Sequence, residues 1–487
     1  MSGSGIRSGS WVLLDNLAAA GIAFGFFVLT ARILTPTEFG VAAIAISISQ
    51  ILLPLVDSLF HDAIIQREEL EPKDVQVALT ATFLWSLVVA AAMVLLAPAL
   101  AVLTNAPSLT VYMPWLAIAA LASGVMAVPS ALARRQMEFR ALAIRTVLGR
   151  SISAAIGLAL ALWGFGVWAV VVQAVLASLL SAIFLFAAMR PSLRFVFDFA
   201  RLRGLLHFAG PAMGTQLLLF ASSRVFTLIF SALLGPATAA MWNVALRFVE
   251  PLQVVAATAL GQFTLPIYSR KQKDGEGLRE LFIVGSRRAS LVLVPMFVGL
   301  GACARPVIEV MVGEQWLPAA PLMAVICLTF AVVASRQLVE ITLTSLGFPA
   351  LNLMLQAVAI LLSFGGFAIG TYYGLFGATL GWSLRALPFV MLGAVLIKRR
   401  AGVPLMDQVR AIAPVYAASG LMALAVIGVE YIAGGWPPPL MLVAAIATGV
   451  VAYVPLVLLL EPHVREDIRS IVRAGVPVTT APETIVD

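Results

Sequence analysis

Residues 239–266 read AAMWNVALRFVEPLQVVAATALGQFTLP, and this stretch decides how the rest of the chain is interpreted. It is long and apolar enough for a membrane-spanning helix, yet Arg247, Glu250 and Pro251 lie near its middle. A charged group at the centre of a bilayer costs at least about 2.5–3.5 kcal/mol. Arg247 and Glu250 are three residues apart and therefore share one face of a helix. We expect this helix to line a polar cavity, where Pro251 would free a backbone carbonyl.

The composition of the chain is that of a polytopic membrane protein. Of 487 residues, 61% are hydrophobic and only 11% are charged, against about 25% charged in soluble domains. The net charge of +7 does not indicate nucleic-acid binding, because the basic residues lie in short loops between apolar runs. Two cysteines cannot build a disulfide framework.

Apolar runs of about 20 residues recur along the chain, each long enough to cross about 30 Å of hydrocarbon. We expect about fourteen helical spans, near residues 11–33, 39–60, 77–103, 113–132, 146–162, 167–188, 209–233, 238–266, 281–303, 319–344, 351–372, 375–397, 411–433 and 439–460. A closed β-barrel would need shorter, alternating segments. The fold class is therefore all-α.

Similar turns recur six spans apart, which indicates an internal repeat. Leu34-Thr-Pro36 is repeated as Leu234-Gly-Pro236, and Trp163-Gly-Phe-Gly166 as Gly374-Leu-Phe-Gly377. We expect two pseudo-symmetric six-helix lobes around a central cavity, the plan of many alternating-access carriers. The expected division is 1–200 for the first lobe, 201–400 for the second, 401–460 for an added helix pair, and 461–487 for a cytoplasmic tail.

Arginine and lysine set the expected orientation. Four basic linkers, 133–150, 189–208, 267–288 and 398–410, all follow even-numbered spans, while the turns on the other side are nearly uncharged. Positive charge accumulates on the cytoplasmic side. Both termini are therefore expected in the cytoplasm.

Four arginines fall inside expected spans of the second lobe: Arg224, Arg247, Arg336 and Arg385. Guanidinium groups match phosphate oxygens well, so we predict a cationic cavity that binds a pyrophosphate. The alternative is that Arg247–Glu250 and Arg336–Glu340 are structural pairs within their helices. The sequence places no acid within one helical turn of Arg224 or Arg385, so we expect these two arginines to contact the ligand.

Four acids inside the spans are candidates for coupling to H⁺ or Na⁺: Glu250, Glu340, Asp15 and Asp57. For Asp15 and Asp57 the simpler interpretation is a position near the membrane surface, or a helix cap for Asp15. No cofactor and no resident metal is expected, because the three histidines are scattered and no nucleotide-binding loop is present.

Three segments resemble the polysaccharide transporters, the Wzx-type flippases of the multidrug/oligosaccharidyl-lipid/polysaccharide superfamily. They are Ala31-Arg-Ile-Leu-Thr-Pro-Thr-Glu-Phe-Gly40, Leu234-Gly-Pro-Ala-Thr-Ala-Ala-Met-Trp-Asn243 and the turn at 374–377. The resemblance extends over residues 5–460. It implies two six-helix lobes and the movement of undecaprenyl-pyrophosphate-linked oligosaccharides from the inner to the outer leaflet of the bacterial inner membrane. The four arginines are candidates from the residues alone.

The leading hypothesis is thus a lipid-linked oligosaccharide flippase rather than an enzyme. It would be a monomer that contacts membrane lipids and the polysaccharide polymerase or export machinery. Alternatives from the same superfamily are a cation-coupled multidrug antiporter and a lipid II flippase. A membrane glycosyltransferase or polymerase is the alternative from another class, although the longest outer stretch, Ala304–Pro318, is short for one.

Overall fold

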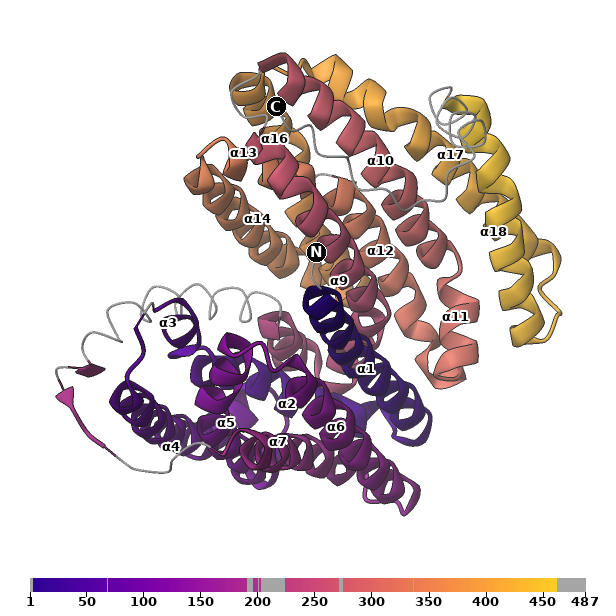
Figure 1. Cartoon of the computed structure of the whole chain (residues 1–487). Helices are drawn as coiled ribbons and strands as arrows, with labels where there is room; N and C mark the ends of the chain where they lie inside the picture. The colour runs from indigo at the N-terminus through magenta and orange to yellow at the C-terminus, as the bar shows by residue number, and fades with distance from the viewer. Residues whose placement is uncertain are drawn as a thin grey trace. The chain divides into compact units, whose positions relative to one another are not determined.

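The computed structural model describes residues 3–67, 69–190, 196–199, 201–202, 224–270, 275–335 and 337–461, with side chains omitted at 3–10, 13, 62, 66, 254–270, 275–276 and 335. The elements assigned in these ranges are helices, which Figure 1 draws as coiled ribbons. The chain divides into two compact units: Met1–Arg247 with Met311–Ala319, and Phe248–Val310 with Ala320–Asp487.

The first unit is a bundle of long helices, and the last of them continues into the second unit. Its elements are α1 (Gly3–Ile33), α2 (Pro36–Asp57), α3 (His61–Gln66), α4 (Pro72–Leu103), α5 (Leu109–Arg135), α6 (Phe139–Leu162), α7 (Val167–Met189), the helical segment Arg224–Leu234 and α9 (Pro236–Arg270). Helix α5 packs on α2, α3, α4 and α7, and α6 packs on α1 and α7. Helix α2 also packs on α4 and α7.

The first signature segment has a structural explanation in the start of α2. Thr35 caps the helix, and the Glu38 carboxylate accepts hydrogen bonds from the Thr35 backbone N–H at 3.0 Å and from its hydroxyl at 2.8 Å. This is a capping box. A Cβ at Gly40 would overlap the carbonyl of Pro236, and one at Gly166 would press on Glu38. The turns at 34–40, 163–166 and 234–236 therefore meet in one place.

A short segment from much later in the chain completes the first unit. The Trp316 side chain is fully buried, and its indole N–H donates to the Ala31 carbonyl at 2.7 Å. The Phe39 and Trp316 rings meet edge to face with centroids 5.2 Å apart. Arg32 donates to the Met311 carbonyl at 2.8 Å. These contacts explain why Met311–Ala319 belongs to the first unit.

The second unit is organised around α10, which packs on α12 and α17. Its elements are α10 (Gly275–Ala302), α11 (Ala304–Met311), η1 (Glu314–Ala319, shared with the first unit), α12 (Ala320–Ser335), α13 (Gln337–Ser345), α14 (Pro349–Gly370), η2 (Thr371–Tyr373), α15 (Gly374–Ser383), η3 (Leu384–Ala386), α16 (Leu387–Ala401), α17 (Leu405–Ile432) and α18 (Pro438–Leu460). Helices α14 and α15 touch backbone to backbone, because a Cβ at Gly366, Gly370 or Gly381 would overlap a facing carbonyl. Small residues permit this approach in membrane bundles.

The helices have the length and surface of membrane spans. Eleven helical segments in the described ranges are long and apolar enough to cross a bilayer, and one of them, Pro349–Ala401, is 53 residues long and contains both α14 and α16. Leu95, Val102 and Leu361 expose 77%, 80% and 70% of their surface, as expected for side chains that face lipid rather than water. The prediction of an all-α, multi-pass membrane protein is confirmed, and about fourteen spans is consistent with these elements.

Some boundaries differ from the sequence prediction. Helix α6 begins at Phe139 rather than 146, and α3 and α11 were not expected as helices. Residue 200, at the predicted lobe boundary, and residues 203–223, which hold most of the predicted seventh span, lie outside the described residues, as does the tail beyond 461. The predicted lobe limits therefore stay predictions.

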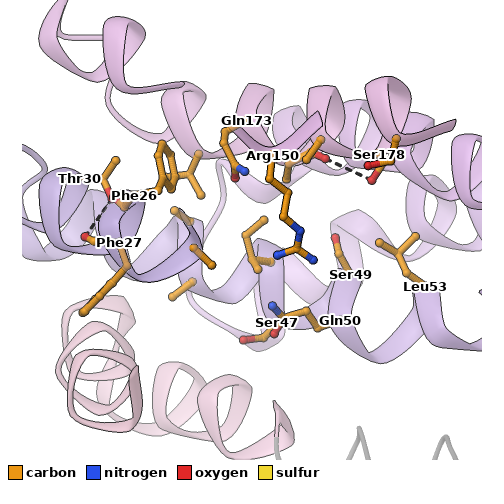
Figure 2. Close-up of a pocket in the computed structure, with 18 of the residues that line it drawn as sticks. Phe26, Phe27, Thr30, Ser47, Ser49, Gln50, Leu53, Arg150, Gln173 and Ser178 are labelled. Atoms are coloured by element: carbon orange, nitrogen blue, oxygen red, sulfur yellow. Dashed lines mark hydrogen bonds between the residues drawn. The ribbon is translucent and has the colours of Figure 1, made fainter. Parts of the chain in front are cut away.

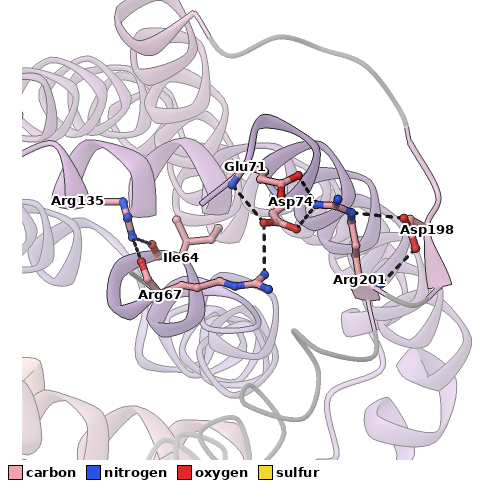
Figure 3. A network of polar contacts seen from close by, with 7 residues as sticks. All are labelled: Ile64, Arg67, Glu71, Asp74, Arg135, Asp198 and Arg201. Carbon is pink, nitrogen blue, oxygen red and sulfur yellow. Dashed lines mark hydrogen bonds and ion pairs between the residues drawn. The ribbon is translucent and has the colours of Figure 1, made fainter. Parts of the chain in front are cut away.

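An ionic clamp ties the residues after α7 to the start of α4 (Figure 3). Arg201 donates to Glu71 and to Asp74, each at 2.9 Å, and Asp74 is 3% exposed. Arg67 reaches the other oxygen of Asp74 at 3.4 Å. Hydrogen bonds to Asp74 and Glu71 raise the pKa of Arg201.

Arg135 donates to the carbonyls of residues 64, 65 and 67, including that of Ile64 at 2.8 Å. The Arg201 Nε also lies 3.5 Å from the Asp198 carboxylate. We call this group, Arg67, Glu71, Asp74, Arg135, Asp198 and Arg201, the clamp.

Candidate functional site

A polar cavity of about 420 Å³ lies within the first unit. It is lined by helices α1, α2, α5, α6, α7 and the first part of α9. Figure 2 labels lining residues from α1, α2, α6 and α7. The polar and charged side chains in its lining are those of Thr30, Ser47, Ser49, Gln50, Asp57, Ser123, Arg145, Thr146, Arg150, Gln173, Ser178, Ser181, Asn243 and Arg247. A cavity of this size is in the range of small-molecule sites.

Helix α6 contributes two arginines to the cavity. Arg145 is half-buried, and its Nη1 donates to the Met126 sulfur at 3.0 Å. A thioether is a weak acceptor, and a guanidinium has five N–H donors. Arg150 is exposed toward the cavity, where Figure 2 shows its guanidinium near the centre of the lined space, with Ser49 and Gln50 of α2 nearby.

The two arginines of α6 are not neutralised by a close acid. In the described part of the chain, neither Arg145 nor Arg150 makes an ion pair with a carboxylate. Asp15 attracts both guanidinium groups at longer range, and Asp57 also attracts that of Arg145. The cavity therefore carries positive charge with unused hydrogen-bond donors, the chemistry that binds an oxyanion.

Asp57, at the end of α2, lines the same cavity. Its carboxylate hydrogen-bonds to Ser123 of α5, while its Oδ1 atom is buried without a hydrogen-bond partner. Asp15 of α1 is half-buried, and its Oδ1 likewise has no partner. Asp15 is not part of the cavity lining.

The structure places Arg247 and Asn243 of α9 in the cavity lining. Asn243 is buried and donates to the Ala239 carbonyl at 2.9 Å and to the Thr227 hydroxyl at 3.1 Å. These bonds fix α9 against the helical segment that begins at Arg224. Arg224 is half-buried in that segment and is not among the lining residues.

The other predicted site residues belong to the second unit. The Arg385 guanidinium lies over the Trp382 ring at 4.9 Å, a cation–π contact. The Glu340 carboxylate accepts a hydrogen bond from Gln356 at 3.0 Å. Glu250 is half-buried on α9. Arg336 lies outside the described residues, so its predicted pairing with Glu340 stays a prediction.

Sequence reasoning missed the contribution of α6. It assigned Arg145 and Arg150 to a basic linker at 133–150, and the linker was wrong because α6 is already helical from Phe139 and carries both residues. A signal for the correct interpretation was present in the spacing. Arg145, Gly149 and Ser153, and likewise Thr146 and Arg150, are four residues apart, which places small and polar groups along one side of a helix.

Comparison with known proteins agrees with this architecture. A model of the family described as polysaccharide biosynthesis protein matches residues 29–321. The succinoglycan biosynthesis transport protein ExoT of Rhizobium meliloti (strain 1021) is 26% identical over 475 residues, covering 97% of this chain and 96% of that protein. The lipopolysaccharide biosynthesis protein WzxC of Escherichia coli (strain K12) is 21% identical over 397 residues, covering 81% of this chain and 78% of its own length.

Solved structures with a similar fold are membrane transporters. The lipid II flippase MurJ, in an inward closed conformation, superposes with a TM-score of 0.71 at 12% identity, covering 94% of this chain and 99% of that one. An inward-facing multidrug resistance transporter of the MATE family and MOP superfamily gives a TM-score of 0.62 at 13% identity, covering 80% and 94%. At 12% and 13% identity, these similarities show a shared fold.

Proposed function

Because the chain belongs to the polysaccharide biosynthesis protein family, we propose that it is a flippase for undecaprenyl-pyrophosphate-linked oligosaccharide repeat units. It would move precursors of an exopolysaccharide or lipopolysaccharide across the bacterial inner membrane. The relatives are named as transport and biosynthesis proteins for such polymers, which supports a transporter rather than an enzyme.

The observation that carries the substrate proposal is the charge state of the cavity in the first unit. Arg145, Arg150 and Arg247 line one space, and the first two make no ion pair in the described ranges. Charge within membrane-spanning helices is retained mostly where it serves a substrate or a partner. Pyrophosphate presents several oxygens that guanidinium forks can bind bidentately.

The size of the cavity defines which part of the substrate it would hold. At about 420 Å³ it suits a head group and its nearest sugar rather than a whole repeat unit. Hydroxyl and amide side chains such as Ser49, Gln50 and Gln173 would hydrogen-bond sugar hydroxyls. The polyprenyl chain would remain among the lipids, and the two units would rock between inward-open and outward-open states.

Other parts of the proposal concern topology and coupling. Both termini would lie in the cytoplasm, as the basic linkers indicate. The protein would act as a monomer without a cofactor, beside polymerase or export machinery. Coupling to H⁺ or Na⁺ would use Asp15, Asp57, Glu250 or Glu340. Further candidates for contact with the substrate are Arg224, Arg336 and Arg385.

The runner-up is a lipid II flippase, since a cationic cavity would bind its pyrophosphate equally well. A multidrug antiporter is less compatible, because Arg145 and Arg150 make no ion pair among the described residues and a cationic cavity repels cationic drugs.

A gene deletion tests the proposal. We expect loss of surface polysaccharide and accumulation of lipid-linked repeat units in the inner leaflet, with growth and cell-wall synthesis intact. Arrested wall synthesis would indicate lipid II instead. Normal polysaccharide with heightened sensitivity to cationic drugs would reject the flippase proposal in favour of the antiporter.

A further inference from the structure

The cavity contains an acid that opposes the binding of an anion. Asp57 lines the same space as Arg145 and Arg150, although a carboxylate weakens phosphate binding by like-charge repulsion. Its carboxylate interacts with Ser123, and its Oδ1 atom is buried without a hydrogen-bond partner. A simple anion-binding site would not contain such a group, so its presence calls for a role.

Arg145 is held in a way that allows it to change partners. Its guanidinium donates to the Met126 thioether, and Asp15 and Asp57 attract it without a direct ion pair. Replacing a thioether contact by a charge-assisted bond to phosphate strengthens the interaction. Arg145 can therefore turn toward a ligand without breaking a strong bond.

The groups around Asp57 leave Arg145 as its main cationic neighbour within the cavity. Helix α6 contributes Arg145, and the start of α3 contributes His61; both attract the carboxylate. Helix α5 contributes the neutral Ser123, and the cavity side of α7 is formed by uncharged groups such as Gln173. From α4, Trp85 donates to the α2 backbone at Leu55.

We propose that Asp57 and the anionic head group of the substrate compete for Arg145, so that substrate binding is coupled to protonation of Asp57. When phosphate oxygens engage Arg145, the Asp57 carboxylate loses its counter-charge and faces a second anion, so it takes up a proton from the aqueous cavity. No covalent bond other than that O–H bond forms. Conversely, ionised Asp57 recovers Arg145 and promotes release of the head group.

This inference rests on the proposed function and predicts a specific pH dependence. Ionised Asp57 repels the ligand, so affinity falls as pH rises through the titration of Asp57. In Asp57→Asn the amide keeps the shape and the Ser123 contact but cannot ionise. We expect it to bind the head group on the order of tenfold more tightly at neutral pH, to lose the protein's part of the pH dependence, and to export less, because release is slowed.

The experiment uses the full-length protein in lipid nanodiscs with undecaprenyl pyrophosphate, which lacks sugars, as the probe. Dissociation constants are measured from pH 5.5 to 8.5 for the wild type, Asp57→Asn, Asp15→Asn and Glu138→Gln. Glu138 is an exposed acid at the start of α6 and makes no side-chain cap bond, so it serves as the matched control. Thermal unfolding of each variant verifies folding.

The outcomes separate the two proposals. Tighter binding and a flattened pH profile in Asp57→Asn alone, with Glu138→Gln like the wild type, support the competition. The ligand's own titration is common to all four proteins and cancels in the comparison. An Asp57→Asn profile equal to wild type, or a change confined to Asp15→Asn, overturns the competition while pyrophosphate binding stands. No binding by the folded wild type refutes the proposed substrate itself.

Discussion

Arg201 in the clamp and Arg145 in the cavity are cations of the same helical unit, but their donors have different partners. Arg201 bonds to Glu71 and Asp74 at 2.9 Å, whereas Arg145 bonds to a thioether. Charge-assisted pairs hold structure, and donors without strong acceptors remain open to a ligand. The difference teaches that the acceptors around an arginine, rather than its position in the sequence, decide whether it holds structure or can bind a ligand.

The largest effect is expected from removing the cavity arginines. Arg145→Ala with Arg150→Ala should lower export of repeat units at least about tenfold, since each charged hydrogen bond contributes about 1.5–3 kcal/mol. Lysine at both positions should restore part of the activity. Export is measured as surface polymer per molecule of protein. Arg140→Ala, at an exposed position on α6, is the control; equal loss there would show a general effect of charge.

A smaller contrast is expected between two arginines predicted from the sequence. Arg247 lines the cavity and Arg224 does not, so Arg247→Ala should reduce export several-fold more than Arg224→Ala. Both variants are compared at matched protein levels in the deletion strain. The reverse order would move the binding site away from the described cavity.

Breaking the clamp should affect stability rather than transport. Among the described residues, Arg201→Ala leaves the buried Asp74 with Arg67 at 3.4 Å as its remaining ion-pair partner, so we expect the thermal midpoint in detergent to fall by several degrees. Export per folded molecule should stay near the wild-type value. A strong loss of export at an unchanged midpoint would show that the clamp takes part in the transport cycle.

The smallest effect is expected at Met126. Met126→Leu conserves volume, and such core exchanges cost less than about 1.5 kcal/mol. Export should remain within about twofold of wild type, because the weak thioether contact only positions Arg145 before a ligand binds. If this variant lost as much export as Arg145→Ala, the Met126 contact would be essential to orient the guanidinium.

The sequence was sufficient to predict the class of fold. Twenty-residue apolar runs leave little choice but spanning helices, and the turn motifs at Thr35-Pro36 and Gly235-Pro236 mark real helix starts. It could not show why Gly40 is glycine. That reason is contact with Pro236, nearly two hundred residues away, and no local pattern reveals such a contact.

The candidate site was predicted less completely. Arg247 and Asp57 are candidates from the sequence, and both line the cavity. From the sequence, Arg145 and Arg150 indicate topology, because basic residues near the end of a span usually do. In the structure α6 begins seven residues before the apolar run that predicted it. Both arginines therefore lie on a helix that lines the cavity.

The late closure of the first unit has a consequence for biosynthesis. Trp316 bonds to Ala31 across a separation of 285 residues. At roughly 5–20 residues per second, a ribosome needs about 15–60 s to make that length of chain. Throughout this interval Phe39 and the end of α1 lie in the membrane without their final partner. A nascent chain halted before Trp316 should therefore expose the Phe39 region to chaperones or proteases that the finished protein no longer attracts.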